Sequence, residues 1–263
     1  MRLEEPHRSL IATTLGLPSM TSFNLMYCEL PSGVIDIHYL LLHATALKSL
    51  TIACEDTSQG SVDFSTLEQA NQWACLEELM LDVSSLQYFM EWALHPRNCV
   101  LDLRGLRGLE ITNIGDPTRI SKLLVTLGAT LERVRLYAGY WGDTEAYLDF
   151  SLCRQLCSLD INLAFAAYLP RPPLPPWLAN CLQTIPPTTS LCRVIIRMAI
   201  LVDEDNRTSY PPYLDALRSA FHGKSQHFGD IYVLRIIDCG QKCEHKTICG
   251  AVSSLAECIF MLC

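Results

Sequence analysis

A six-residue motif that recurs at a nearly fixed period constrains the fold of this chain more than any other feature. The clearest copies span residues 106–111, 131–136 and 156–161, so they start 25 residues apart, and each is apolar at its first, fourth and sixth positions. We call this motif the hexad. One such pattern also occurs inside helices, but a recurrence at this period is typical of stacked supersecondary units.

Eight copies of the hexad can be placed along the chain. By their first, fourth and sixth residues they are Met20/Phe23/Leu25, Leu47/Leu50/Ile52, Leu76/Leu79/Leu81, Leu106/Leu109/Ile111, Leu131/Val134/Leu136, Leu156/Leu159/Ile161, Leu191/Val194/Ile196 and Ile231/Leu234/Ile236. The fourth and sixth positions are two residues apart, so in a strand they share one face. The third, fifth and seventh positions then point to the other face.

Helical segments are predicted between several hexads. Apolar residues at helical spacing favour helices over residues 62–73, 86–94, 120–127 and 213–221. Asp116-Pro117 suits a cap followed by a first-turn proline, and Gly128 lies just beyond the third segment. The alternation of strand and helix predicts an α/β fold, with the repeat domain at 20–237, an N-terminal segment at 1–19 and a Cys-rich C-terminal segment at 238–263.

The array of hexads resembles a leucine-rich repeat protein, and its irregular repeat length is similar to the repeat regions of fungal F-box substrate-receptor proteins. The resemblance implies a right-handed solenoid of about eight irregular strand-helix units. It also implies a protein-binding scaffold, as in the substrate-recognition region of a ubiquitin-ligase adaptor. An F-box itself is not found, because the residues after Leu17-Pro18 lack its helical apolar pattern. The Asn or Cys of the family's ninth position is replaced in the well-spaced copies by Glu55, Ser84, Ile114, Gly139 and Ala164.

Composition narrows the classes of function and location. The net charge is −8 and no basic tract occurs, which argues against a nucleic-acid partner. No apolar run approaches the ~20 residues of a membrane span, and the N-terminus lacks the apolar core of a signal peptide. The 13 cysteines are odd in number and several adjoin hexads, as expected for small core residues in a reducing compartment. We therefore expect an intracellular protein, cytoplasmic or nuclear.

Two local motifs favour a structural interpretation over a chemical one. Cys239, Cys243, His245 and Cys249 form the densest group of metal-ligand residues, but their spacing is unlike that of common zinc sites. We expect no bound metal and no cofactor. The proline-rich stretch at 170–177 predicts an extended conformation, read either as a peptide ligand or, preferably, as a stiff insertion that lengthens its repeat.

The outward hexad positions provide the candidate binding site. In the later repeats they bring together Arg133, Arg135, Tyr137, Arg193 and Arg197, residue types that are favoured as binding anchors. These five residues predict a site for a protein segment that is acidic or phosphorylated. The alternative is a solvated ladder in which the arginines pair with Glu110 and Asp160 on neighbouring strands.

Two rival functions remain open at this stage. A small α/β enzyme would show similar alternation of strands and helices, but it would need polar residues clustered where its strands end. No shared catalytic set follows the hexads, so no catalytic residue is assigned and we predict that the chain is not an enzyme. The second rival is a truncated gene product without independent function, suggested by the missing F-box and the apolar ending at 259–263.

Overall fold

The fold was analysed in a computed structural model of the chain. The structure describes residues 5–56, 67, 73–82, 89–93, 100–114, 117–138, 148–164, 176–186, 191, 193–200 and 232–238. The chain divides into two compact units, Met1–Ile114 and Gly115–Cys263, and each is described by itself.

The first unit is built on a parallel sheet. Its described strands are β1 (Ser22–Leu30), β2 (Ser49–Asp56), β4 (Glu78–Asp82) and β6 (Gly108–Ile114), and they lie side by side in chain order. The short strands β3 (Ala74–Cys75) and β5 (Leu101–Asp102) form a separate parallel pair. Each strand of the main sheet therefore has the next main strand of the chain as its neighbour.

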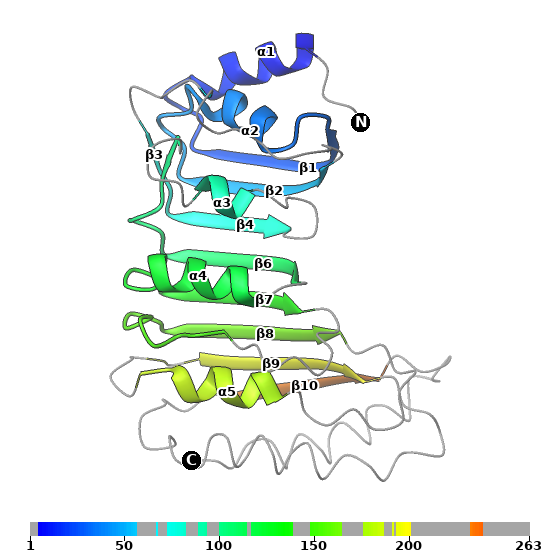
Figure 1. The fold of residues 1–263 in the computed structure, drawn as a ribbon, viewed down its shortest axis with the longest axis vertical. Helices are drawn as coiled ribbons and strands as arrows, with labels where there is room; N and C mark the ends of the chain where they lie inside the picture. Colours follow the sequence, from blue (N-terminus) through cyan, green and yellow to red (C-terminus); the bar gives the residue numbers. More distant parts are fainter. Residues whose placement is uncertain are drawn as a thin grey trace. The chain divides into compact units, whose positions relative to one another are not determined.

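Helices of the first unit gather on one face of its sheet. Helix α2 (Val34–Leu41) follows β1, and α3 (Phe89–Ala93) follows β4 (Figure 1). Helix α1 (Glu5–Leu15) precedes the sheet and packs against α2. Successive parallel strands need a connection that crosses back over the sheet. The first unit is therefore a series of repeats, each made of one strand and one crossover connection.

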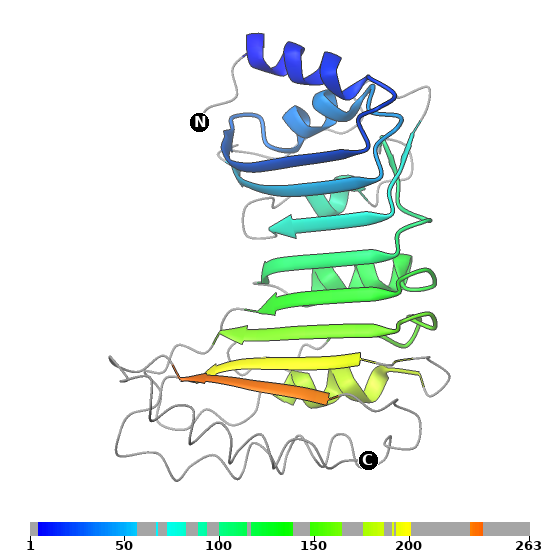
Figure 2. The same ribbon diagram turned by 180° about the vertical axis from the view of Figure 1, so that it is seen from behind.

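The second unit repeats the same plan. Its described strands β7 (Arg133–Ala138), β8 (Ser158–Ala164), β9 (Arg193–Ile200) and β10 (Tyr232–Asp238) are parallel and in chain order. Helix α4 (Pro117–Leu127) precedes β7 and α5 (Pro176–Thr184) lies between β8 and β9. Seen from behind, the strands of this unit stand in front of both helices (Figure 2). The predicted α/β class is therefore confirmed, with all main strands parallel.

Each of the eight hexads coincides with one of these parallel strands. In the first unit, the fourth positions align directly, since Leu50 pairs with Leu79 and Leu79 with Leu109. In the second unit Val134 pairs with Leu159 and Leu159 with Val194. All of these residues are buried, and buried aliphatic ladders are what a parallel sheet with one helix-covered face requires.

The last hexad is the exception, because its strand is shifted by two residues relative to an alignment of equivalent hexad positions. Leu234, at the fourth position, lies opposite Ile196 instead of Val194, and Tyr232 takes the place opposite Val194. A shift of two residues keeps every side chain on its original face, whereas a shift of one would exchange the faces. The alternation predicted for this strand is consequently retained.

The predicted helices agree with the structure only in part. Helix α3 lies inside the predicted 86–94 segment, and α4 begins at Pro117, the predicted first-turn proline. The predicted helix at 213–221 and most of the predicted helix at 62–73 lie outside the described residues. Ala74, directly after the second range, belongs to β3. The extended conformation predicted for 170–177 is wrong at its end, because α5 begins at Pro176. Proline suits the first helical turn, where its missing N–H has no intrahelical partner.

Buried polar groups tie the helices of the first unit together. The indole Nε1–H of Trp92 in α3 donates to Nδ1 of His38 in α2 at 3.2 Å, and both residues are buried. In α2, the Asp36 carboxylate accepts from the Ser32 N–H at 2.9 Å and forms a 2.9 Å ion pair with Arg8 of α1. These contacts satisfy polar groups that would be costly to bury alone. Among the described helices, none has the length and apolar character needed to cross a membrane.

Candidate protein-binding surface

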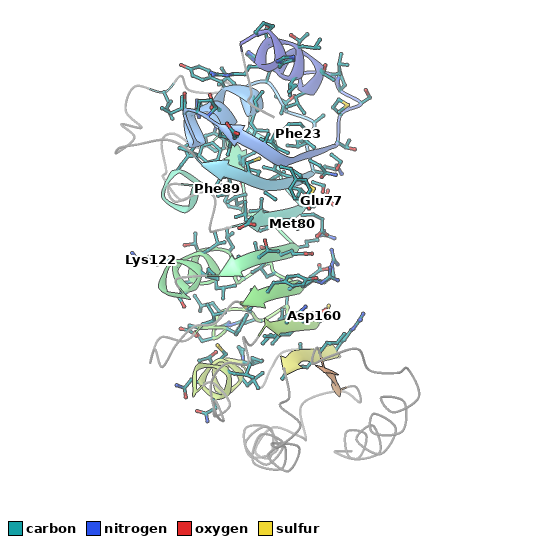
Figure 3. All side chains as sticks on the ribbon, turned by 90° about the vertical axis from the view of Figure 1, so that its right-hand side faces the viewer. Phe23, Glu77, Met80, Phe89, Lys122 and Asp160 are labelled. Atoms are coloured by element: carbon teal, nitrogen blue, oxygen red, sulfur yellow. The ribbon has the colours of Figure 1, made fainter. Side chains whose placement is uncertain are left out.

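The candidate site lies on the sheet face of the second unit that points away from its helices. The hexad residues Val134, Leu159 and Val194 are buried on the opposite side, so the alternate residues face this one. Of these alternate residues, Asp160 and Ile195 are themselves buried. In Figure 3, Lys122 lies on the helix side of the unit and Asp160 on the strand side. We call the face of the second unit's sheet that points away from its helices the arginine face. Its positions are Arg133, Arg135, Tyr137, Ser158, Asp160, Asn162, Arg193, Ile195, Arg197, Val233 and Arg235.

Strand register orders the arginine face into three rows. The first row runs Arg133, Ser158, Arg193 across β7, β8 and β9. The second row runs Arg135, Asp160, Ile195, Val233, and the third runs Tyr137, Asn162, Arg197, Arg235. Since neighbouring strands lie ~4.8 Å apart, residues in one row are adjacent. All five predicted site residues therefore occupy register positions of this one face, and their role in binding stays a prediction.

Arg135 has an acidic neighbour on the face itself. Nε of Arg135 lies 3.5 Å from Oδ2 of Asp160, whose residue is only 5% exposed. The Arg135–Asp160 ion pair is one contact of the solvated ladder described above as the alternative to a binding site. The predicted partnership with Glu110 would join the two units and stays a prediction. Arg135 is thus partly engaged in holding β7 to β8.

Arg133 and Arg193 occupy the two ends of the first row and are both exposed. Nη1 of Arg133 lies 3.5 Å from Oε2 of Glu132, its neighbour in sequence, and half of the Arg133 side chain remains in solvent. A surface ion pair of this kind contributes little, about 0–1 kcal/mol. Between the two arginines stands Ser158, which is small and uncharged. This row can therefore present two guanidinium groups to an anionic partner.

The structure adds Arg235 to the residues proposed from sequence. As the fifth residue of its hexad Arg235 is equivalent to Ile195, but the two-residue shift of β10 places it directly opposite Arg197. Like charges at opposed positions of a sheet are destabilising unless an anion or a counter-charge intervenes. Only the pairing of the strands reveals this juxtaposition, because the spacing between the last two hexads gives no register.

The corresponding face of the first unit has the opposite charge. Its outward positions on β4 and β6 include Glu78, Asp82 and Glu110. The Glu78 carboxylate occupies the space that a side chain at Gly108, its register partner, would fill. Gly108, at the third position of its hexad, therefore leaves room for the Glu78 side chain to lie across the sheet.

The described residues were also searched for a metal-binding site. Within the part of the chain that the structure describes, no three His, Cys, Asp or Glu side chains are grouped so that they could hold a metal ion. Cys239, Cys243, His245 and Cys249 lie outside the described residues. Comparison of the chain with protein-family models, with curated proteins and with solved structures finds no match.

Proposed function

We propose that this chain is a protein-binding scaffold that holds an acidic or phosphorylated protein segment on its arginine face. The observation that carries the proposal is the register of β7 to β10, which aligns Arg133 with Arg193 and Arg197 with Arg235. Among the described register positions of this face, five are arginines and one, Asp160, is acidic. Such an excess of planar, bidentate donors suits carboxylate and phosphate groups.

The proposal includes the finer architecture of the chain. We take the strand-helix units to form a right-handed solenoid of about eight leucine-rich-repeat-like units. Two observations support this: the strands follow chain order within each unit, and each hexad contributes one strand. Crossovers between parallel strands are right-handed in about 98% of cases. A solenoid presents one residue set from every repeat on a continuous binding surface.

The resemblance to F-box substrate receptors suggests what kind of scaffold this is. In that setting the arginine face would recognise the substrate of a ubiquitin ligase, and a phosphorylated segment would be a suitable signal because its charge is switched on by modification. Since no F-box is found, the proposal covers substrate recognition alone. Affinity capture with the full chain as bait tests the wider assignment, which predicts a ubiquitin-ligase subunit among the captured proteins.

Fluorescence anisotropy tests the site itself. The probe is a labelled, Glu-rich peptide carrying phosphoserine, titrated with the full chain at low and at physiological ionic strength. Binding should weaken as salt rises, because exposed charges are screened beyond ~8 Å at 0.15 M. The double variant Arg133→Ala with Arg193→Ala should lose ~2 kcal/mol of binding, about 30-fold, with its unfolding midpoint nearly unchanged.

A charge-matched variant provides the control. Lys122→Ala with Arg154→Ala also removes two exposed positive charges from the second unit, but from outside the arginine face. It should bind within about two-fold of the parent chain, since distant surface charges add little to affinity at physiological salt. Equal losses in the two double variants would mean that only net charge matters. Persistent binding with lowered stability in the Arg133/Arg193 variant would instead make these arginines part of a structural ladder.

A further inference from the structure

Two cysteines face each other across the first strand pair of the chain. Cys28 of β1 and Cys54 of β2 lie with their sulfur atoms 3.1 Å apart. Both residues are buried and both are free thiols. Cys54 Sγ also donates to the backbone oxygen of Leu25 at 3.2 Å, so the Cys28 thiol is left as the donor between the two sulfurs. The contact is therefore between two thiols held in one fixed arrangement.

A backbone irregularity creates this contact. Met26 pairs with Ala53 and Glu29 with Glu55, so two residues of β1, Tyr27 and Cys28, oppose Cys54 alone. This is a β-bulge, and Tyr27 within it has a positive φ of 55°. Without the bulge, Cys28 would lie opposite Glu55. The bulge thus brings the two sulfurs together and turns Tyr27 outward, where it is 85% exposed.

We propose that Cys28 and Cys54 are a disulfide-forming pair that a small oxidant of the peroxide class closes reversibly. Closing the bond needs the sulfurs to approach by about 1 Å, from 3.1 Å to the ~2.05 Å of a disulfide. Among the described strands β1 lies at the edge of the sheet and pairs with β2, so the adjustment falls on a bulged edge strand. Positive φ at a non-glycine residue is a strained state that such a site retains when the surrounding structure enforces it.

The chemistry is a two-electron oxidation with hydrogen peroxide as the oxidant. The Cys28 thiolate attacks one peroxide oxygen, the O–O bond breaks, and a sulfenic acid forms as hydroxide leaves and takes up the thiol proton as water. Cys54 sulfur then attacks the sulfenic sulfur, the S–O bond breaks, and the departing oxygen leaves as water with the Cys54 proton. Two thiols and one peroxide give one disulfide and two waters.

The two cysteines differ in their parts in this reaction. Burial, followed by the adjacent Cys28, raises the pKa of the Cys54 thiol to about 12, so it is protonated at neutral pH. A protonated thiol is a poor first nucleophile. Cys54 is therefore placed as the resolving partner, with its sulfur already 3.1 Å from that of Cys28.

A closed disulfide would tether the segment that presents Tyr27. The bond joins residues 28 and 54 and encloses α2 (Val34–Leu41) in the loop. Cross-linking a loop of this length restricts the unfolded chain and stabilises the fold. Oxidation should therefore raise the thermal unfolding midpoint by about 5 °C or more, reversibly on addition of dithiothreitol.

Peptide mapping of the full chain tests the pair. The reduced protein is titrated with hydrogen peroxide, denatured in N-ethylmaleimide and digested, and cross-linked peptides are sequenced by mass spectrometry. We expect a Cys28–Cys54 cross-link that appears before any other among the 13 cysteines and disappears with dithiothreitol. Separate alkylation of Cys28 and Cys54 after exposed thiols have been oxidised would overturn the proposal and leave a hydrogen-bonded core pair. So would a cross-link of Cys28 to any other cysteine.

Two serine variants sharpen the result. Cys75→Ser removes an exposed thiol of the same unit and should keep the cross-link and its thermal shift. Cys54→Ser should lose both, and its Cys28 sulfenic acid should persist long enough to be trapped by dimedone, at a yield at least ten-fold above that of the parent chain. A Cys54→Ser chain that still shows the oxidative thermal shift would refute the assignment. If this variant fails to fold, the map of the unaltered chain and of Cys75→Ser decides.

Discussion

Removing one leucine from the centre of the second sheet tests the role of the hexads quantitatively. Leu159 is fully buried on β8, between Val134 and Val194 of the flanking strands. Leu159→Ala deletes three buried carbons, which at about 0.8 kcal/mol each gives ~2.4 kcal/mol of lost transfer free energy. Rigid strands on both sides limit collapse, so the remaining cavity raises the expected loss to ~3–4 kcal/mol. Ser158→Ala, one residue away on the other face, should cost less than ~0.5 kcal/mol.

Urea denaturation followed by circular dichroism measures this difference. With a urea m-value of about 2–3 kcal/mol/M, the Leu159→Ala midpoint should fall by ~1–2 M, and the Ser158→Ala midpoint should fall by less than ~0.3 M. The backbone N–H of Ser158 bonds the Glu132 carbonyl, and alanine preserves this bond. Similar midpoints for the two variants would refute the assignment of the fourth hexad position to a packed core. A changed slope would show that the substitution had altered more than stability.

Three further predictions concern polar contacts and metal. Trp92→Phe should cost ~1–3 kcal/mol of unfolding free energy, measured by denaturation, because buried His38 loses the indole donor at its Nδ1. The hydrogen bond from Arg104 holds the pKa of Asp102 below its ordinary value, so this pair stabilises the fold above about pH 4 and loses its effect as pH falls through the lowered pKa. Denaturation at about pH 6 should therefore show Arg104→Ala slightly less stable than the parent chain, because the pair is exposed, and the gap should close in strong acid. Prolonged EDTA treatment should leave the unfolding midpoint unchanged, whereas a structural zinc site would lose its fold.

The strands were predictable because they depend on local pattern. A residue pair such as Leu109 and Ile111, two apart and both apolar, specifies one buried strand face irrespective of distant contacts. The recurrence of that pair at a regular interval then gives the order of the strands, since each short crossover returns the chain to a neighbouring position. Parallel strands in chain order follow from these two facts alone.

Helices were less predictable because their signals are weaker in this chain. The α2 segment is largely apolar all round, with Val34, Ile37, Leu40 and Leu41 buried, so no clear amphipathic period marks it. Its two polar residues, Asp36 and His38, are buried as well, and only their partners on other elements make this tolerable. Such partners cannot be read from the α2 sequence. Prediction fails here because tertiary contacts decide the burial.

The sequence predicted which face of the sheet carries the arginines, but it did not predict every residue of the site. Alternation placed Arg133, Arg135 and Arg193 on one face without knowledge of the register. The neighbours of each arginine depend on register, which the long connection before β10 leaves unspecified by local pattern. Hence Arg235 beside Arg197 emerged only from the strand pairing. The Cys28–Cys54 contact depends in the same way on a bulge that adds one residue to β1.

The ninth position of the sixth hexad shows how this chain can dispense with Asn or Cys there. A side chain at the ninth position is needed where the backbone turns away from the sheet and its polar groups lose their partners. Strand β8 continues to this position instead, so that ninth-position Ala164 is still paired with Ala199 on β9. The same strand pair holds Asn162 opposite Arg197, which lies in turn opposite Arg235 of β10. The pairing of β8 with β9 along their length therefore satisfies the β8 backbone and also sets the third row of the arginine face.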